Sequence, residues 1–310
     1  MPFLLFVVSA LFALLLASGV YVFVVGCVRR KELPWLVEEE IMKTPYGKFC
    51  SCITAADRWL KENHAADITT ISKDGLKLHA YWIPAENPRG TVLLAHGYRS
   101  SMLLDFGAAF EVYLDLGLNI LVPDQRAHGK SQGRFITFGV KESQDMLCWI
   151  CYHNSNFGEL PLILSGMSMG ASTVLYLADE ELPANVKGII ADCGFTSPRD
   201  ILASVFKDVT QLPAGPSLVV ADLCARLFAG FGLNQKDTRR SLANSKLPIL
   251  LIHGVEDGFV PCAMSEQAYA ACTGPKQLLL VEGADHGVSF LQAPDRYGKA
   301  VMDFIENHMI

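Results

Sequence analysis

The chain has 310 residues, of which 51% are hydrophobic and 19% charged, and its formal net charge is −6 at pH 7. This length suits one large domain or two small ones. The longest basic run is Arg29-Arg30-Lys31, so the sequence lacks the basic stripe of a nucleic-acid-binding protein and indicates no nucleic-acid partner.

The first 28 residues contain no charged side chain. About 20 apolar residues span the hydrocarbon core of a bilayer, so we predict a transmembrane anchor over residues 1–28. A buried core helix would show a polar face, which this segment lacks. A cleaved signal peptide would have a basic start and a shorter apolar stretch. A lipoprotein signal ending at Cys27 is a further alternative that stays open.

The charges beside this segment predict its orientation. Arg29, Arg30 and Lys31 follow the apolar run, and nothing basic precedes it. Positive flanks stay in the cytoplasm. We therefore expect a single-pass membrane protein whose main domain is cytoplasmic and whose short N-terminus lies outside.

The nine cysteines are odd in number and scattered, which does not indicate a disulfide framework. Cys148-x-x-Cys151, with His153 nearby, has one feature of a zinc site but lacks a second ligand pair. We favour buried thiols on one helix face and predict no metal site.

After a connector over residues 29–65, helical over 54–64, the remaining domain is predicted to span residues 66–310. It opens with a hairpin, in which segments 68–72 and 76–83 flank Lys73-Asp74-Gly75. Apolar strands then alternate with helices, which is typical of a mostly parallel sheet covered on both faces. The predicted strands are 91–95, 119–123, 161–164, 186–191, 248–252 and 277–281, and the predicted helices are 103–116, 140–153, 169–179, 263–272 and 294–307.

More than fifty residues separate the strand that ends near Asp192 from the one that begins at Pro248. A single crossover helix needs far fewer residues. We predict a helical cap over about residues 197–245, with helices at 201–209 and 218–228. Phe206 and Phe228 belong to apolar stripes on these helices and are the candidates for lining a substrate pocket.

The segment Gly166-Met167-Ser168-Met169-Gly170 follows a predicted strand directly and precedes a predicted helix. G-x-S-x-G in this context indicates a nucleophilic serine on a tight turn, where the two glycines remove side chains that would collide. Ser168 is the candidate nucleophile.

A serine needs a base to act as a nucleophile at neutral pH. His286 lies in the loop after the last predicted strand, at the same sheet edge as Ser168, whereas His96, His128 and His253 precede glycines in turns. The acid should lie between the serine and the histidine in the chain. Asp257 fits this position, and Asp192 stays open as a second candidate.

A developing oxyanion requires backbone donors. We expect them to be the N–H of Met169, next to the nucleophile, and the N–H of Tyr98, after the first parallel strand.

These segments, in this order, resemble the α/β-hydrolases, and the resemblance covers the chain from about Ile68 onward. It is similar to the esterase and serine-aminopeptidase-like branch, although His96-Gly97-Tyr98-Arg99 differs from the lipase HGGG loop. The resemblance implies an α/β-hydrolase fold with a helical cap, here joined to an N-terminal transmembrane helix. It also favours Asp257, because the family draws its acid from the loop before the helix that precedes the last strand.

The expected reaction is acyl transfer from an ester, thioester or amide, a small-molecule acyl substrate, to water, without a metal or an organic cofactor. An acyltransferase, with an alcohol as acceptor, is one alternative. A catalytically silent hydrolase fold that serves as a binding module is another. The sequence does not specify the acyl group or the oligomeric state.

Overall fold

The structure is a computed structural model that describes residues 2–30, 38–43, 45–62 and 65–309. Lys31, the last residue of the basic run, and His64, the end of the predicted connector helix, lie outside the described residues.

The centre of the protein is an eight-stranded sheet with the order β1-β2-β4-β3-β5-β6-β7-β8. Strands β1 and β2 form the predicted antiparallel hairpin, β2 also pairs antiparallel with β4, and all later neighbours pair in parallel. The predicted mostly parallel sheet with a leading antiparallel hairpin is therefore confirmed. The strands are β1 (Ala66–Ile71), β2 (Lys77–Ile83), β3 (Gly90–Ala95), β4 (Leu118–Asp124), β5 (Leu162–Met167), β6 (Val186–Asp192), β7 (Ile249–Gly254) and β8 (Lys276–Val281).

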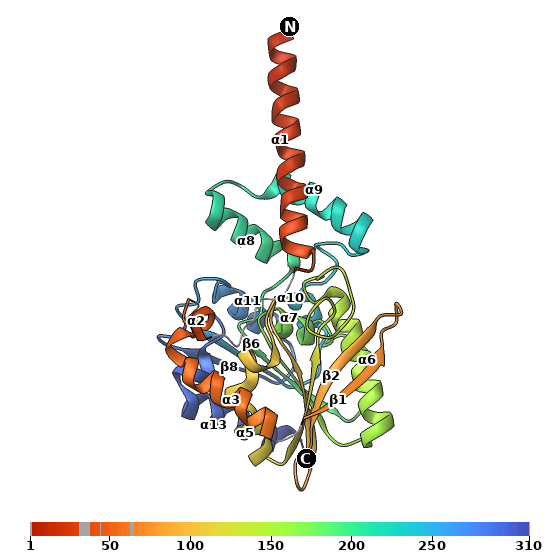
Figure 1. Cartoon of the computed structure of the whole chain (residues 1–310), viewed down its shortest axis with the longest axis vertical. Coiled ribbons are helices and arrows are strands. Elements are labelled where there is room, and N and C mark those ends of the chain that lie inside the picture. Colours follow the sequence, from red (N-terminus) through yellow and green to blue (C-terminus); the bar gives the residue numbers. More distant parts are fainter. Residues whose placement is uncertain (1, 31–37, 44, 63–64, 310) are drawn as a thin grey trace.

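Helices cover both faces of this sheet (Figure 1). One apolar layer includes side chains from α4 (Met102–Phe106), α5 (Phe110–Asp115) and α13 (Pro294–His308), and the other from α6 (Val140–Phe157), α7 (Met169–Leu175) and α11 (Ala263–Ala271). The predicted helix 103–116 is divided in two by the 3-10 turn η2 (Gly107–Ala109). The short helix α12 (Ser289–Gln292) precedes α13.

The connector forms three short elements on the surface of the domain. They are α2 (Glu38–Ile41), the 3-10 turn η1 (Pro45–Phe49) and α3 (Cys50–Glu62). Ile41 and Ile53 are buried against Leu104 of α4. The described part of the connector thus packs on the domain and contributes to its core.

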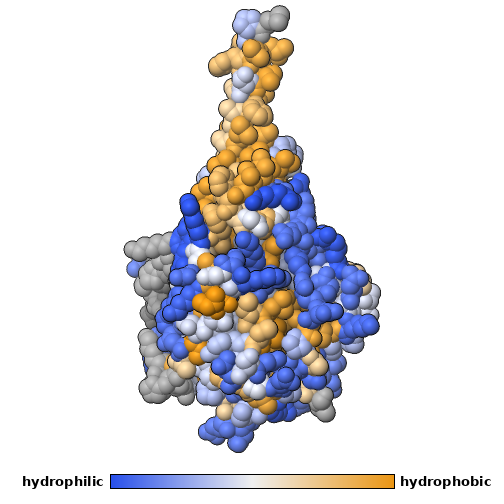
Figure 2. Space-filling view, turned by 90° about the vertical axis from the view of Figure 1, so that its right-hand side faces the viewer, coloured by the Kyte–Doolittle hydropathy of each residue, from blue (hydrophilic) through white to orange (hydrophobic). Residues whose placement is uncertain are grey.

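The apolar N-terminal segment forms a single helix, α1 (Pro2–Cys27), which projects away from the body (Figure 1). It is long and apolar enough to cross a membrane, and most of its surface is exposed. In the space-filling view its hydrophobic surface continues to the junction with a largely hydrophilic body (Figure 2).

The residues between β6 and β7 form α8 (Pro198–Thr210), α9 (Gly215–Cys224), the π-helical turn η3 (Ala225–Ala229) and α10 (Thr238–Ala243). Helices α8 and α9 flank the lower part of α1 beyond the carboxyl edge of the sheet, whereas α10 packs on α7 and α11 in the body (Figure 1). Only α8, α9 and η3 therefore stand above the sheet, and we call these three the insertion helices.

Helix α1 packs closely against α9. Ser18 Oγ lies 2.7 Å from Ser217 Oγ. A Cβ atom at Gly19 would collide with Val220 and with the carbonyl oxygen of Ser217. The absence of a side chain at Gly19 thus permits this approach.

The C-terminal end of α1 is bonded to the body. Arg99 Nη2 donates to the carbonyl oxygens of Val25 (2.7 Å) and Val28 (3.1 Å), and the Tyr98 hydroxyl donates to that of Gly26 (2.9 Å). The last carbonyl groups of a helix have no partner within it, so these contacts satisfy them. Beyond the helix, a β-bridge pairs Val28 with Phe135.

Candidate active site

Ser168 lies between the end of β5 and the start of α7, with φ 55° and ψ −115°. Positive φ is uncommon for a residue with a side chain and indicates a strained backbone. A Cβ at Gly166 would collide with the carbonyl group of Gly170, and one at Gly170 would collide with that of Ala95. The two glycines therefore allow the tight turn that the sequence predicts.

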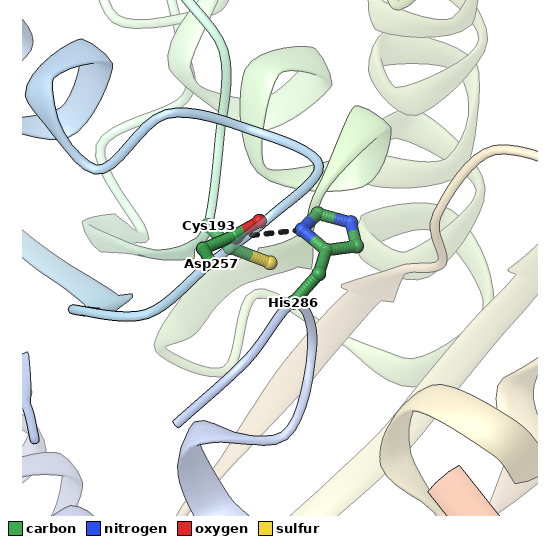
Figure 3. Close-up of side chains that lie close together, drawn as sticks. All are labelled: Cys193, Asp257 and His286. Carbon is green, nitrogen blue, oxygen red and sulfur yellow. Dashed lines mark hydrogen bonds and ion pairs between the residues drawn. The ribbon is translucent and has the colours of Figure 1, made fainter. Parts of the chain in front are cut away.

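His286 bridges Ser168 and Asp257. Its Nε2 lies 2.9 Å from Ser168 Oγ, and its Nδ1 lies 2.7 Å from Asp257 Oδ2. Because a carboxylate accepts hydrogen bonds, Nδ1–H is the donor to Asp257, which leaves Nε2 to accept from the serine hydroxyl. Figure 3 shows the Asp257 carboxylate directed at the imidazole from the neighbouring loop.

Asp257 is held as an anion by the loop around it. Its side chain is completely buried, and Oδ1 accepts the backbone N–H groups of Phe259 (2.9 Å) and Val260 (2.8 Å). Burial alone would raise the pKa of this carboxyl, but hydrogen bonds from His253 and His286 outweigh burial and hold the pKa well below its usual value. Asp257 thus stays charged beside the imidazole at neutral pH.

His253 is a participant that sequence reasoning missed. Its Nε2 lies 3.1 Å from Asp257 Oδ2 and 3.0 Å from the Val260 carbonyl oxygen, and its Nδ1 lies 2.6 Å from Ser265 Oγ. It therefore provides a second imidazole contact to the same carboxylate oxygen, Oδ2, that His286 contacts. The available signal was its position four residues before Asp257, at the end of a buried strand.

Asp192, the second candidate for the acid, occupies a different environment. Its Oδ1 accepts a hydrogen bond from Ser289 Oγ (3.1 Å), and its main-chain oxygen accepts from the Ser168 N–H (2.8 Å). Within the described residues, no hydrogen bond joins its carboxyl group to His286. Burial raises the pKa of Asp192 to about 6. The structure thus brings Asp257, and not Asp192, to the imidazole.

The two proposed oxyanion donors lie on either side of the serine turn. Met169 is the first residue of α7, where backbone N–H groups have no partner within the helix. On the other side, Gly97 N–H donates to Asp105 (2.6 Å) and Arg99 N–H donates to His128 Nε2 (2.9 Å). The intervening N–H of Tyr98 has no hydrogen-bond partner in the described part of the chain, so it is available to a ligand.

A cavity of about 1050 Å³ includes Ser168 in its lining. Its other walls come from α1, from α8, from the start of α9 and from loop residues that include Tyr98, Arg99 and Phe259, and most of the lining is apolar. Phe206 is part of it, as predicted from the sequence. Phe228 is a correction, because it is absent from the described lining residues; its ring is 65% exposed and packs against Phe23 of α1.

The prediction of one apolar stripe on the second insertion helix is also corrected, because its residues do not share one surface. Val219, Leu223 and Leu227 point outward and are exposed, whereas Val220 packs on Gly19 of α1. These apolar residues therefore face two directions. Val220 is covered by α1, whereas Val219, Leu223 and Leu227 are not covered by protein.

Within the described residues, one group of candidate metal ligands comes together around His286. Cys193 Sγ lies near Asp257 and His286, with the ligand atoms of the three residues within 4.8 Å of one another (Figure 3). However, burial raises the pKa of the Cys193 thiol well above its usual value, and a protonated thiol is a poor ligand. Cys148 and Cys151 do share helix α6, but the prediction that they are buried is wrong, since Cys148 is half-buried and Cys151 exposed.

Comparison with known proteins finds a matching family model and a similar fold. Residues 86–214 match the family described as serine aminopeptidase, S33. The fold is similar to the Pyrococcus furiosus esterase Pf2001, with a TM-score of 0.66 and 24% identity, covering 80% of this chain and 93% of that one. The chain thus has the α/β-hydrolase fold, and the two matches support the α/β-hydrolase superfamily.

Similar sequences span most of the chain. The uncharacterized protein YqkD of Bacillus subtilis is 28% identical over 234 residues, 75% of this chain and 76% of its own. The uncharacterized membrane protein YNL320W of Saccharomyces cerevisiae is 23% identical over 239 residues, 77% of this chain and 78% of its own. The matched regions therefore extend well beyond the serine turn.

Proposed function

We propose that this α/β-hydrolase is a membrane-anchored serine hydrolase that cleaves a carboxylic ester, or a related thioester or amide, through an acyl-enzyme on Ser168. The observation that carries the proposal is the position of His286, which lies within hydrogen-bonding distance of both Ser168 Oγ and the buried carboxylate of Asp257. A nucleophile, a base and a group that orients the base are the three parts of such a mechanism.

In the acylation step, Ser168 Oγ attacks the substrate carbonyl carbon while His286 Nε2 takes the hydroxyl proton. Asp257 holds the imidazole in the required tautomer and stabilises the imidazolium that forms. The bond from the carbonyl carbon to the leaving group then breaks, and His286 passes the proton to that leaving group.

In the second step, water attacks the acyl-enzyme. His286 takes a proton from the water, the bond to Ser168 Oγ breaks, and the serine recovers its proton. The backbone N–H groups of Met169 and Tyr98 would stabilise the oxyanion in both steps, because they flank the serine turn and are free for a ligand.

Three observations support α1 as a retained membrane anchor. It is long and apolar enough to span a bilayer, and a yeast relative is called a membrane protein. Its end is bonded to Tyr98 and Arg99 of the body. Because these bonds make α1 part of the folded protein, they favour an uncleaved helix over a signal that is removed. We accordingly propose residues 1–28 as the anchor, with the hydrolase domain in the cytoplasm.

Labelling with a fluorophosphonate probe tests the proposed chemistry. The full chain should become labelled at Ser168 and should hydrolyse p-nitrophenyl esters. Ser168→Ala should abolish labelling and lower kcat by roughly 10⁴-fold, because only binding and the oxyanion donors remain. Esterase activity above a tenth of the wild-type value in a clean preparation of the variant would refute the assignment of Ser168.

A further inference from the structure

We propose that the substrate of this site is a long-chain ester resident in the membrane, which reaches Ser168 from within the bilayer through the cavity between α1 and α8. This inference rests on the proposed hydrolase function. It makes α1 a wall of the substrate site in addition to an anchor.

The first argument is the composition of the cavity walls. Leu11, Leu14 and Leu15 of α1 line the same cavity as Ser168, together with Leu202, Val205 and Phe206 of α8. Apolar walls that end at a few polar groups are typical of sites for hydrophobic ligands. Since Ser168 is only 6% exposed, an acyl chain would have to lie along these walls to bring its carbonyl carbon to the hydroxyl group.

The second argument is where the cavity opens. Leu11 and Leu14 line it yet are 61% and 67% exposed, and the same holds for Val209 (77%) in the last turn of α8 and Leu212 (60%) just after it. A lining residue that remains exposed marks a mouth. This mouth therefore lies between the middle of α1 and the C-terminal end of α8, away from the hydrophilic body.

The third argument is the depth of that mouth in a membrane. The 26 residues of α1 extend about 39 Å at 1.5 Å per residue, whereas the hydrocarbon core is about 30 Å thick and takes about 20 residues. If the hydrocarbon begins at Pro2, it ends near Tyr21. Ser18 then lies about 5 Å and Leu15 about 9 Å inside the boundary. If the hydrocarbon core lay further toward Cys27 along α1, Ser18 and Leu15 would both lie deeper inside it.

The insertion helices must share this depth, because α9 contacts α1 at Ser18 and Gly19. Their outward face fits such an environment, with Val219, Leu223, Leu227 and Phe228 all exposed. Apolar faces of interfacial helices enter membranes by about 5–10 Å, which agrees with the depth derived from α1. In water, this exposed apolar surface would be costly.

Three charged residues limit the depth. Lys207 and Asp208 lie in the last turn of α8, Arg226 lies in η3 beside Leu227, and all three are exposed. A lysine can reach the headgroup region while its methylene stem stays in an apolar environment, but a carboxylate has less reach. The insertion helices are thus expected at the boundary of one leaflet, where an ester group lies level with the entrance and its acyl chain can enter from the side.

Two adjacent residues of α1 provide a matched test. Leu15 lines the cavity, whereas Leu16 is absent from the described lining and is 40% exposed. The full chain in phosphatidylcholine vesicles would be assayed with 4-methylumbelliferyl oleate, which resides in the bilayer, and with the water-soluble acetate. Both esters have the same leaving group, and their distribution between water and bilayer is the same for every variant. A change in the ratio of their rates from one variant to another therefore reports how the acyl chain is bound.

Leu15→Trp should lower the oleate-to-acetate ratio by at least about 10-fold, because the indole fills the path of the long chain. Leu16→Trp should keep the wild-type ratio. Leu15→Ala enlarges the cavity without a steric clash and should change the oleate-to-acetate ratio. Leu16→Ala should leave that ratio at the wild-type value. Equal ratios in the Leu15 and Leu16 variants would overturn the proposal.

Assays of the wild-type protein distinguish failure of the bilayer route from failure of the proposed hydrolase function. Hydrolysis of the acetate without hydrolysis of the oleate in vesicles would overturn the bilayer route and leave the proposed hydrolase function intact. Failure with both esters, together with no fluorophosphonate labelling of Ser168, would instead refute the hydrolase function itself.

Discussion

The hydroxyl group of Tyr98 donates a hydrogen bond of 2.9 Å to the carbonyl oxygen of Gly26. Tyr98 thereby joins the last turn of α1 to the loop whose backbone N–H we propose as an oxyanion donor. The same ring stacks on Phe138 at a centroid distance of 5.4 Å, so it is held from two sides. The position of α1 and the geometry of the candidate site are thus connected through one residue.

Tyr98→Phe tests this connection. The variant keeps the backbone N–H and the ring stacking but loses a hydrogen bond worth about 1 kcal/mol. We expect a lower Tm and a loss in kcat of less than about 10-fold, measured with p-nitrophenyl esters. Tyr269→Phe, on the distant helix α11, should change neither value. A loss as large as that of Ser168→Ala would mean that the phenol itself acts on the reacting atoms.

The acid is tested by a pair of isosteric variants. Asp257→Asn would present an amide to His286 Nδ1 and favour the wrong tautomer, so kcat should fall by about 10⁴-fold. Asp192→Asn should cost far less, because the Asp192 carboxyl group bonds to Ser289. If Asp192→Asn proved as harmful as Ser168→Ala while Asp257→Asn remained active, the assignment of the acid would be reversed.

Asp192 should instead affect stability as a function of pH. Burial raises its pKa to about 6, whereas the unfolded chain has an ordinary value near 4. The folded state then binds the proton more tightly, so this contribution is complete below about pH 4 and is lost as the pH rises through 6. The loss amounts to about 3 kcal/mol. Asp192→Asn should remove it, so the difference in unfolding free energy between wild type and variant should change between pH 4 and 7; a constant difference would contradict the prediction.

Two phenylalanines of the insertion helices form a control pair for acyl-chain length. Phe206 lines the cavity, whereas Phe228 packs outside it on Phe23. Phe206→Ala should enlarge the cavity and shift preference toward longer acyl chains in a series of p-nitrophenyl esters. Phe228→Ala should leave the chain-length profile unchanged. If both variants kept the same chain-length profile with the fold intact, Phe206 would contribute only to packing.

The orientation of the domain can be tested in cells. Arg29 and Arg30 follow α1, and Arg29 donates to the carbonyl oxygens of Gly129 (2.7 Å) and Ser131 (2.7 Å) in the body. Positive flanks stay cytoplasmic. A reporter that works only in the cytoplasm should therefore be active when fused to the C-terminus, and protease added outside intact cells should spare the domain. Digestion from outside would reverse the proposed topology.

The sequence predicted what local patterns determine. The parallel strands are short apolar runs, and the turn at Ser168 requires glycines on both sides, so the sheet and the predicted nucleophile could be located from spacing alone. The residue pattern could not separate Asp257 from Asp192, since both follow strands at the same sheet edge, and only the family resemblance favoured Asp257. Only the tertiary fold shows that the Asp257 loop lies against His286.

The limits of pattern-based reasoning are clearest in the insertion helices. The apolar positions of 218–228 predicted a helix correctly. Periodicity does not tell which apolar face packs against protein and which stays exposed on the outside of the molecule. The outward direction of Leu223 and Leu227, and the contact of Val220 with Gly19, depend on where α1 lies. That position is set by contacts about 200 residues apart in the sequence, such as Ser18 with Ser217.

The contact between α1 and α9 has a consequence for any shortened or chimeric form of this enzyme. A chain that begins after Cys27 would lose more than its attachment, because Val220 would be uncovered and the cavity would become an open trough. Such a chain should be prone to self-association and should discriminate poorly between acyl groups. An unrelated transmembrane helix could restore the attachment, but without a residue as small as Gly19 opposite Ser217 it could not dock in the same place.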